Sequence, residues 1–230
     1  MIDTVLKDIL IYEDDDLVVI NKPSGVLSIE DGYDKDKFNL RSALRTIYGS
    51  IWAIHRLDKD TSGVILFAKN QASHRELNIS FSNRETEKNY RAIVNGYPIW
   101  NSFEIILPLK VNGDRSHRTI YDPIQGKPAR TRINKVINNA QFAYMDIFPT
   151  TGLTHQIRAH LSAIGLPIFG DRLYWRCCQL TDFLKFEQKD FFLHAHSLKF
   201  LHPISKESMH FTAPLPILFS EKLTDLKLSI

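Results

Sequence analysis

The apolar positions in the first third of the chain predict strands and helices in alternation. From Asp16 to Pro23 the apolar residues follow one another almost without a break, which is typical of a short buried strand. From Phe38 to Tyr48 they recur at helical spacing, which predicts a helix. We expect strands next at residues 51–54 and 64–68 and then a helix at about residues 72–82. A polar turn, Lys59 to Gly63, separates the two strands.

Strand-like runs dominate the middle of the chain. Apolar and β-branched runs predict strands at residues 90–94, 103–107, 118–121, 129–136 and 142–148, and Gly, Pro and Asn lie between these runs. A final pair of strands is expected at residues 191–201 and 209–213, before Pro214-Leu-Pro216 starts a short C-terminal helix. Because the sequence contains no repeat, low-complexity tract or clear linker, the pattern favours one mixed α+β domain over residues 1–230.

A helix in the second half carries its apolar and polar residues on different faces. Thr154 is a residue type that can cap such a helix, and Gly165 is one that can end it. The apolar face consists of Ile157, Leu161 and Ile164. His155 and Arg158 point elsewhere, so the helix presents polar groups away from the core.

Composition narrows the class of protein. The 230 residues are 43% hydrophobic and 24% charged, which is an ordinary globular balance. No apolar run approaches the roughly 20 residues that a membrane helix needs, and Met1-Ile2-Asp3 does not resemble a targeting segment. The only cysteines, Cys177 and Cys178, are adjacent and offer no ordinary disulfide framework. We therefore expect an untargeted, soluble protein of the cytoplasm.

Charge is distributed unevenly along the chain. The formal net charge is +3, but residues 1–36 hold ten acids and three lysines, a net of −7, so the remainder carries +10. A basic body of this kind can hold a polyanion through its phosphates. Exposed Lys and Arg are also common as plain solvated groups, so charge alone does not decide between the two.

The most polar turn combines an acid with basic and hydroxyl side chains. In His55-Arg-Leu-Asp-Lys-Asp-Thr-Ser-Gly63, Asp58 lies between Arg56 and Lys59 at the mouth of a predicted strand. Neighbouring positive charge lowers the pKa of a carboxylate and keeps it ionised, which suits a nucleophile or an electrostatic stabiliser rather than a proton donor. The same residues also suit a plain hairpin turn, in which Asp58 or Asp60 bonds its own backbone. Spacing alone leaves both interpretations open.

A second polar segment runs from Thr151 to His160, where a turn leads into the amphipathic helix. Arg158 could pair with a carboxylate or a phosphate, because its guanidinium fork fits either partner. An arginine in the first turn of a helix is also common as a surface residue. This segment does not decide the function by itself either.

Taken together, six blocks of the sequence resemble the RluA family of pseudouridine synthases, and they follow the family's order. His55 to Ala68 resembles the signature around the family's catalytic aspartate, and Lys88 to Gly96 resembles the block with its active-site tyrosine. The other blocks are Asn21–Gly25, Gly126–Ala129, Thr151–His160 followed by Gly165–Asp171, and Leu193–Ala195 through His202-Pro203 to Phe211–Pro216. The match covers nearly the whole chain and is specific.

The resemblance implies an isomerase that converts uridines of ribosomal or transfer RNA to pseudouridine without a metal, nucleotide or redox cofactor. It implies that Asp58 is the catalytic aspartate, that Tyr90 packs against the target base and that Arg158 pairs with the aspartate. Arg56 would enter the RNA where the uridine leaves the stack. Turning the uridine out of the base stack costs the least free energy where stacking is weak, as in loops. We therefore expect a stem-loop target. The implied fold is a bent, mostly antiparallel sheet flanked by helices, with the active site in a central cleft.

Further residues are expected to contact the RNA. His55 and Thr61 flank the aspartate in the signature, and His155 belongs to the block Thr151–His160. The segment from Lys110 to Lys135 holds seven Lys or Arg against two Asp, so we expect it to lie along the RNA. From this segment we single out Arg115, Arg118, Lys127 and Arg130. A solvated basic face is the alternative, and we expect the acidic N-terminal segment to stay off the RNA.

Two features depart from the wider family. Leu153 stands where the family usually has arginine, so a phosphate or backbone contact of that arginine is expected to be missing. We expect this to alter RNA affinity without removing the chemistry. Only 54 residues precede His55, whereas many relatives carry a separate RNA-binding domain there. The chain therefore resembles the short, single-domain members, and we expect a monomer with no obligate protein partner.

Three other interpretations stay open. Asp58 and Asp60 could serve a glycoside or nucleoside hydrolase, although that chemistry needs one raised pKa and both acids lie among basic residues. The chain could also be an RNA-binding or chaperone protein that no longer performs the chemistry, with Leu153 as the first sign. A metal site could use four histidines, but cysteine or carboxylate ligands at useful spacing are missing, so we expect no metal. These histidines are His194, His196, His202 and His210.

Overall fold

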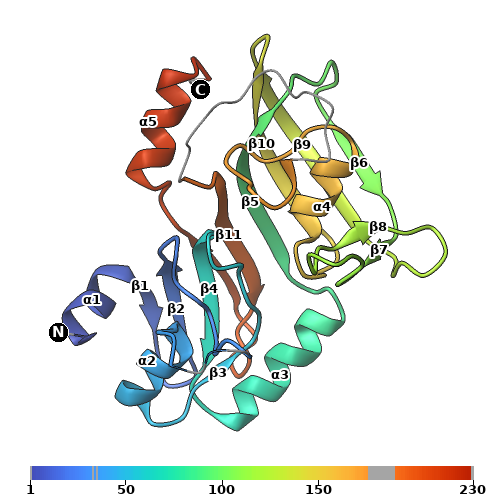
Figure 1. The fold of residues 1–230 in the computed structure, drawn as a ribbon. Helices are drawn as coiled ribbons and strands as arrows, with labels where there is room; N and C mark the ends of the chain where they lie inside the picture. The colour runs from blue at the N-terminus through green and yellow to red at the C-terminus, as the bar shows by residue number, and fades with distance from the viewer. Residues whose placement is uncertain (1, 33, 35, 176–189, 229–230) are drawn as a thin grey trace. The chain divides into compact units, whose positions relative to one another are not determined.

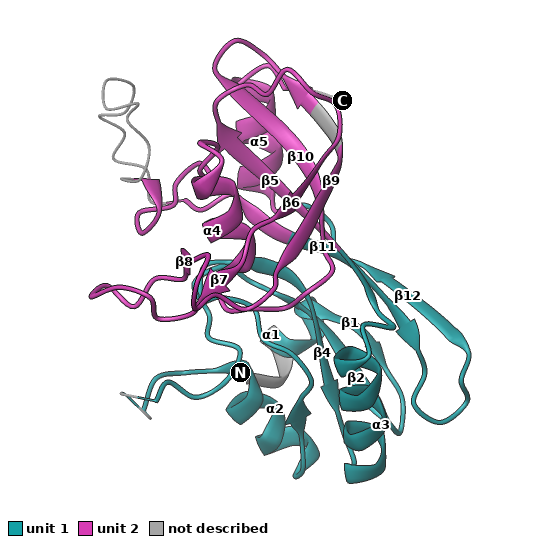
Figure 2. Cartoon of the chain, turned by 90° about the vertical axis from the view of Figure 1, so that its right-hand side faces the viewer, with its two compact units in different colours: residues 1–88, 195–215 teal, residues 89–194, 216–230 magenta. Residues whose placement is uncertain are grey.

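The computed structural model describes residues 2–32, 34, 36–175 and 190–228 (Figure 1). The chain forms two compact units, residues 1–88 with 195–215 and residues 89–194 with 216–230 (Figure 2). Strands β5 (Glu87–Asn95) and β11 (Leu193–Leu201) carry the chain from one unit to the other. The expectation of a single domain stays a prediction. Cys177 and Cys178 lie outside the described residues.

The first unit is built on strands in the order β1-β2-β4-β11, with β12 beside β11 and β3 beside β4. Its further elements are α1 (Ile2–Ile9), β1 (Leu10–Glu13), β2 (Leu17–Lys22), α2 (Leu40–Tyr48), β3 (Trp52–Ala53), β4 (Ser62–Ala68), α3 (Gln71–Ser82) and β12 (Ser208–Thr212). The pairs β1–β2, β2–β4, β3–β4 and β11–β12 are antiparallel. Strand β4 is buried along its whole length, because it has a neighbouring strand on either side.

The second unit has strands in the order β5-β10-β9-β6 and a separate pair, β7–β8. Its further elements are β6 (Phe103–Ile106), β7 (Leu109–Lys110), β8 (Ile120–Tyr121), β9 (Arg130–Asn138), β10 (Phe142–Pro149), α4 (Gln156–Ala163) and α5 (Ile217–Asp225). All four of these strand pairs are antiparallel. None of the helices in the described part of the chain is long and apolar enough to cross a membrane.

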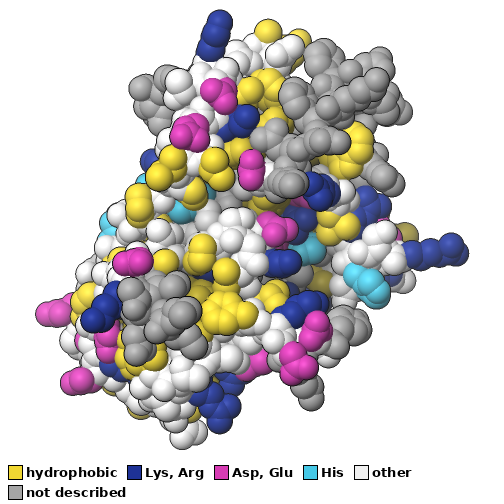
Figure 3. Space-filling view, turned by 60° about the vertical axis from the view of Figure 1, so that its left-hand side comes forward, with side chains coloured by type: hydrophobic (Ala, Val, Ile, Leu, Met, Phe, Trp, Pro, Cys, Tyr) yellow, Lys and Arg dark blue, Asp and Glu magenta, His cyan; other side chains and the backbone are white. Residues whose placement is uncertain are grey.

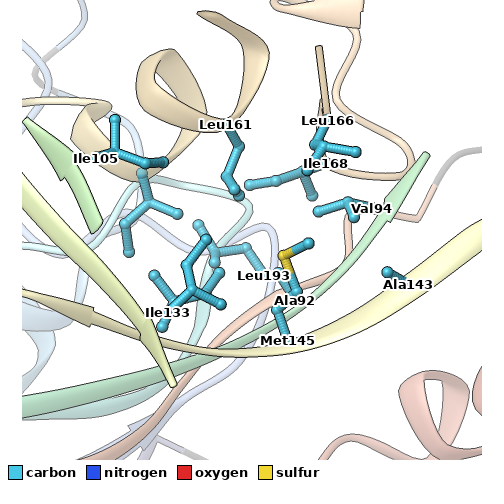
Figure 4. Close-up of a cluster of buried hydrophobic side chains, with 12 residues drawn as sticks. Ala92, Val94, Ile105, Ile133, Ala143, Met145, Leu161, Leu166, Ile168 and Leu193 are labelled. Carbon is cyan, nitrogen blue, oxygen red and sulfur yellow. The ribbon is translucent and has the colours of Figure 1, made fainter. Parts of the chain in front are cut away.

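Two clusters of side chains fix the helices of the second unit. Under α4, Ile157 and Leu161 pack with buried residues of the strands, among them Ala92 and Met145 (Figure 4). Burying Leu161 alone stabilises the unit by roughly 2 kcal/mol. A row of aromatic rings at centroid distances of 5.4–5.5 Å connects β10 to α5. Its members are Phe142, Phe169, Phe192 and Phe219. Helix α4, which carries Arg158, therefore rests on a packed core.

The α+β class with a mostly antiparallel sheet flanked by helices is confirmed, and most predicted elements exist with slightly shifted ends. The bend of the sheet and the central cleft stay predictions. Three short elements at residues 2–9, 10–13 and 109–110 were not predicted. Residues 2–9 do have apolar positions at helical spacing (Ile2, Val5, Leu6 and Ile9), a signal that was missed, whereas the strands at 10–13 and 109–110 are too short to show a clear period.

One local prediction is wrong, and two elements differ in detail from what the sequence pattern suggests. Thr154 does not cap α4: the residue before Gln156 is His155, which has a left-handed φ of 55° and makes no capping bond with its side chain. The strand expected at residues 51–54 is reduced to Trp52–Ala53. Ile47, which shares its helical face with Leu44, is 42% exposed, and Ala43 is buried instead. The buried face of α2 is therefore narrower than the spacing of its apolar residues indicates.

Gly63, the second residue of β4, lies at a position with no room for a side chain. Its φ is +111°, and a Cβ there would lie well inside van der Waals contact with the backbone of Ala195 on β11. We expect Gly63→Ala to lower the free energy of unfolding by roughly 3 kcal/mol or more, through backbone strain and the clash together. Urea unfolding measures this decrease.

Gly25→Ala is the matched control, because Gly25 also has a positive φ, +83°, but has open space where a Cβ would stand. Its free energy of unfolding should fall only by the backbone contribution, about 1 kcal/mol. Equal decreases at the two positions would contradict the steric explanation.

Candidate active site

The turn that carries Asp58 is bound to the segment after β2. The carbonyl of Lys59 accepts a hydrogen bond from the Gly25 amide at 3.0 Å, and the carbonyl of Asp60 accepts one from the Ser24 hydroxyl at 2.7 Å. Within the turn, the amide of Thr61 donates to the carbonyl of Asp58 at 3.1 Å. The half-buried Asp58 therefore projects from a backbone that is fixed on both sides.

Ser28 holds the other end of the same turn. Its hydroxyl donates to the carbonyl of Leu57 at 2.9 Å and accepts from the amide of Leu57 at 3.1 Å. Both groups are buried, so each bond satisfies a polar atom that water does not reach. The residue before Asp58 is consequently as well anchored as the residues after it.

Lys22 lies beneath the turn with its ammonium group fully buried. The Nζ atom donates to the carbonyl oxygens of Pro23 at 3.0 Å, Val26 at 2.7 Å and Lys59 at 2.8 Å. Burial lowers the pKa of Lys22 to about 8, while Asp60 and Asp58 act in the opposite direction. Sequence reasoning assigned no role to this lysine; its signal was a basic residue in an otherwise apolar buried strand.

His55 is held as a neutral side chain. Its Nε2 accepts a hydrogen bond from the amide of Leu66 at 3.1 Å, and its ring stacks on Phe81 at a centroid distance of 5.3 Å. Burial, and then the nearby charge of Lys88, lower the pKa of His55 to about 3. Its expected RNA contact stays a prediction, and such a contact would use a neutral imidazole rather than a cation.

The two other predicted contact residues of the signature differ in exposure. Arg56 is exposed at the start of the turn, where a side chain can reach a ligand. Thr61 is only 2% exposed. Contact between RNA and either residue stays a prediction, and for Thr61 it requires a change in the packing around it.

Gln156, the first residue of α4, anchors the loop that leads into the helix. Its Oε1 accepts from the Thr151 hydroxyl at 2.7 Å and from the Leu153 amide at 3.1 Å. Its Nε2 donates to the carbonyl of Arg130 and the hydroxyl of Thr131, both at 3.0 Å. Because the side chain is buried and uses both ends of its amide, it ties the loop to the beginning of β9.

Arg158 forms a two-pronged ion pair with Asp171. Its Nε lies 2.7 Å from Oδ2 and its Nη2 lies 2.9 Å from Oδ1 of that carboxylate. Asp171 ends a block that the sequence singled out, but its role was missed because nothing in the spacing indicates an acid facing the helix. Asp58 belongs to the first unit and Tyr90 and Arg158 to the second, and their joint action stays a prediction.

Some basic residues of the segment from Lys110 to Lys135 are already paired. Arg118 binds Asp114 at 2.6 Å and also donates to the carbonyl of Leu173, and Arg130 binds Glu104 at 3.0 Å. Arg115 and Lys127 are exposed and make no ion pair with any described residue. On the face drawn in Figure 3, Lys and Arg side chains lie singly or in small groups among acidic and apolar ones. RNA binding by this segment stays a prediction.

Leu153, which stands at the family's usual arginine position, is part of an apolar contact. It packs against a buried cluster on one side of α4. The cluster consists of Leu109, Ala129, Ala159 and Tyr174. The leucine therefore contributes to the packing of its loop, while its effect on RNA affinity stays a prediction.

His202 lies with two acids and not with the three other histidines considered for a metal. Asp14, Asp16 and His202 form the one group of potential ligands found among the described residues. The Nδ1 of His202 is close to the amides of Ile204 and Ser205, at 3.3 and 3.1 Å. Because Nδ1 must then accept, the proton is on Nε2, which donates to Asp14 at 3.1 Å. This arrangement joins two turns of the first unit.

Comparisons with known proteins agree with this architecture. Residues 16–163 match the family model described as RNA pseudouridylate synthase. An uncharacterized RNA pseudouridine synthase of Mycoplasma genitalium is 37% identical, over 98% of this chain and 72% of its own length. The dual-specificity RNA pseudouridine synthase RluA of Pasteurella multocida is 36% identical, over 89% of this chain and 92% of its own.

A solved structure shows the same fold. The human RNA pseudouridylate synthase domain containing 4 superposes with a TM-score of 0.77 at 23% identity, over 99% of this chain and 96% of that one. The matches in sequence and fold thus cover the turn with Asp58, the strand with Tyr90 and the helix with Arg158. The chain belongs to the RNA pseudouridylate synthase family and is an RluA-like pseudouridine synthase, an isomerase.

The neutral state of His55 predicts a pH dependence of stability. The pKa of His55 is about 3 in the folded chain, and its ordinary value is 6.5. Between these two pH values the unfolded chain binds a proton at His55 and the folded chain does not. Stability from this residue is therefore present above pH 6.5 and declines as the pH falls, by roughly 2–3 kcal/mol at pH 4. Urea unfolding between pH 4 and 7 measures it.

Replacing His55 by Gln removes the titration but keeps an acceptor for the Leu66 amide. The stability of His55→Gln should therefore change less with pH than that of the native protein. The exposed residue His210 supplies the control, since His210→Gln should leave the native slope unchanged. A His55→Gln slope as steep as the native one would refute the explanation.

Proposed function

We propose that this pseudouridine synthase modifies uridines in stem-loops of ribosomal RNA, transfer RNA or both, with Asp58 as its catalytic carboxylate. The observation that carries the proposal is the turn around Asp58. It lies in the region matched by the family model and is held by Ser24 and Gly25, by Ser28 and by the buried ammonium of Lys22. The name of the similar Pasteurella protein, a dual-specificity enzyme, supports two classes of RNA substrate.

The reaction exchanges one bond to the ribose for another. The bond from uracil N1 to the ribose carbon C1′ breaks, the base turns, and C5 forms the new bond to C1′. C5 then loses its proton and N1 takes one up, so that the product is an isomer of the substrate. An ionised carboxylate at Asp58 either attacks C1′ or assists the removal of a sugar proton to form an unsaturated sugar. Both routes need a carboxylate that is fixed beside the sugar, which the anchored turn provides.

Tyr90 and Arg158 take the two supporting roles in this proposal. Tyr90 packs against the core of the second unit, so its ring is a firm surface for the target base. Arg158 keeps the carboxylate of Asp58 charged after water leaves. A guanidinium has five donors, so an arginine that is paired with Asp171 through two of them can also serve a second carboxylate.

The proposal extends to RNA contacts and to the state of the protein in the cell. Arg56, Arg115 and Lys127 are exposed and are proposed to bind RNA, with Arg56 at the flipped uridine. His55, Thr61, Arg118, Arg130 and His155 complete the proposed RNA-binding set. A monomer in the cytoplasm is proposed, in keeping with a reaction that needs no second subunit.

Asp58→Asn should abolish tritium release from [5-³H]uridine-labelled ribosomal and transfer RNA, because the amide cannot act as a carboxylate. We expect a decrease on the order of 10³-fold or more. Asp60→Asn is the control: this exposed neighbour contributes its backbone carbonyl to the turn, which the substitution keeps, and it should retain native release.

The same assay separates the alternatives. An inactive Asp60→Asn together with an active Asp58→Asn would contradict the assignment. Free uracil in the products would indicate a hydrolase, and absence of release by the native protein from either RNA pool would favour an RNA-binding protein without the chemistry.

Replacing both Arg115 and Lys127 by alanine should weaken RNA binding, because their side chains would no longer neutralise phosphates. The slope of log K against log salt is negative, and its magnitude should decrease by about 0.7–0.9 for each phosphate that is no longer neutralised. These two residues are preferred to Arg118, whose bonds to Asp114 and Leu173 also hold its loop.

Lys37→Ala serves as the control for this experiment, because Lys37 is also exposed but is paired with Asp31 in the acidic N-terminal segment. Salt titrations of both variants, read by fluorescence anisotropy of a labelled stem-loop, measure the affinity and the slope. A double variant with the native affinity and slope would show that the segment is a solvated face.

A further inference from the structure

Arg158 is held more firmly than an arginine in a first helical turn usually is. Its partner, the carboxylate of Asp171, has no solvent exposure, and the Arg158 side chain is only 13% exposed. The two parallel bonds, at 2.7 and 2.9 Å, fix the plane of the guanidinium as well as its distance. A lysine could not be fixed in this way, because its ammonium has no plane to match.

The carboxylate of Asp171 is itself held by the backbone. Its Oδ1 accepts from the amides of Leu173 at 3.0 Å and Tyr174 at 3.1 Å. The Asp171 amide donates to the carbonyl of Ile168 at 3.1 Å. The carboxylate therefore keeps its orientation through its own turn and does not depend on Arg158 for it.

Two aromatic rings complete the surroundings of the guanidinium. The central carbon of Arg158 lies 5.0 Å from the ring centroid of Tyr174 and 5.2 Å from that of Phe191. Both distances are within the range of cation–π attraction. Together with the in-plane bonds to Asp171, the rings oppose rotation and displacement of the group.

Tyr174 is fixed in its turn. Its hydroxyl accepts a hydrogen bond from the amide of Thr119 at 2.8 Å and lies 3.2 Å from Nδ1 of His155. Its carbonyl accepts from the Ser162 hydroxyl at 3.0 Å. Burial raises the pKa of Tyr174 to about 12, so the hydroxyl stays neutral at physiological pH.

A buried ion pair of this kind is a poor way to gain stability. Removing two charges from water is costly, and an apolar pair of similar volume is often at least as stable. What the pair provides is orientation. An arginine side chain has many rotamers, and a group fixed before the reaction starts does not have to be ordered in the transition state.

We infer that Asp171 is a positioning residue of this enzyme, which sets the guanidinium of Arg158 in the orientation that the reaction uses. Tyr174 and Phe191 support the same orientation. The inference rests on the proposed function of Arg158, and it gives a role to the acid that ends the block Gly165–Asp171.

The test compares Asp171→Asn, Arg158→Met and the double variant in single-turnover tritium release, below the unfolding temperature of each protein. Asp171→Asn keeps the shape and removes the charge. It should lower the single-turnover rate on the order of 10- to 100-fold and change the RNA dissociation constant less than about twofold. In the Arg158→Met background it should cause no further decrease in rate, because no guanidinium remains to be positioned.

Asp146→Asn is the matched control. Asp146 also forms an ion pair in the second unit, with Arg91 at 3.2 Å, and neither residue has a proposed part in the chemistry. Its single-turnover rate should equal that of the native protein. If Asp171→Asn does not fold, Asp171→Glu replaces it: the charge stays but the guanidinium shifts, so the rate should fall with the same dependence on Arg158.

The possible failures can be told apart. Equal decreases in rate from Asp171→Asn in the native and Arg158→Met backgrounds would overturn the inference, because Asp171 would then act independently of Arg158. A native rate in Asp171→Asn together with a slow Arg158→Met would also overturn the inference. The proposed function of Arg158 would survive that result. A native rate in Arg158→Met would overturn both.

Discussion

The turn around Asp58 depends on the hydrogen bonds that the buried ammonium group of Lys22 donates. Three carbonyl oxygens from two separate segments point at one Nζ atom, at 2.7–3.0 Å. Without the cation the carbonyls of Pro23 and Val26 would lose this partner, while that of Lys59 would keep only its bond from the Gly25 amide. An acceptor left unpaired away from water costs about 1–3 kcal/mol. With the cation, the segment after β2 and the turn around Asp58 form one hydrogen-bonded body. The proposed catalytic carboxylate can then project from a turn and still be fixed.

The second unit applies the same principle with the charges reversed. A fully buried carboxylate, Asp171, holds the planar cation of Arg158 through two bonds, while its own turn holds the carboxylate. In both units a buried charged residue without a part in the proposed chemistry, Lys22 or Asp171, fixes a residue that has such a part. Removing either buried charge leaves its former partners without a counterpart in a largely buried site, so each such replacement is costly.

Loop anchoring in this protein relies on side chains that use all of their hydrogen-bonding atoms. Gln156 binds its own loop with one end of the amide and the start of β9 with the other. His202 accepts two amides and donates to Asp14, which links two turns of the first unit. Leu153 adds an apolar contact where relatives usually carry arginine. The polar segments that mark the family therefore hold the fold together as well as carrying the residues proposed for catalysis.

The sequence by itself determined the family, the α+β class, most of the elements and the identity of Asp58, Tyr90 and Arg158 as the proposed catalytic residues. The class and the elements follow from apolar periods and turn residues, whereas the family and the three proposed residues follow from the resemblance of short blocks in a specific order. Only the tertiary structure revealed the roles of Lys22, Gln156 and Asp171 and the neutral state of His55. Each of these depends on partners far away in the chain, such as Lys22 with Lys59 and Gln156 with Arg130. Burial gives such contacts their strength. The spacing of residues indicates which apolar faces are buried, but it does not show which polar group meets which distant partner.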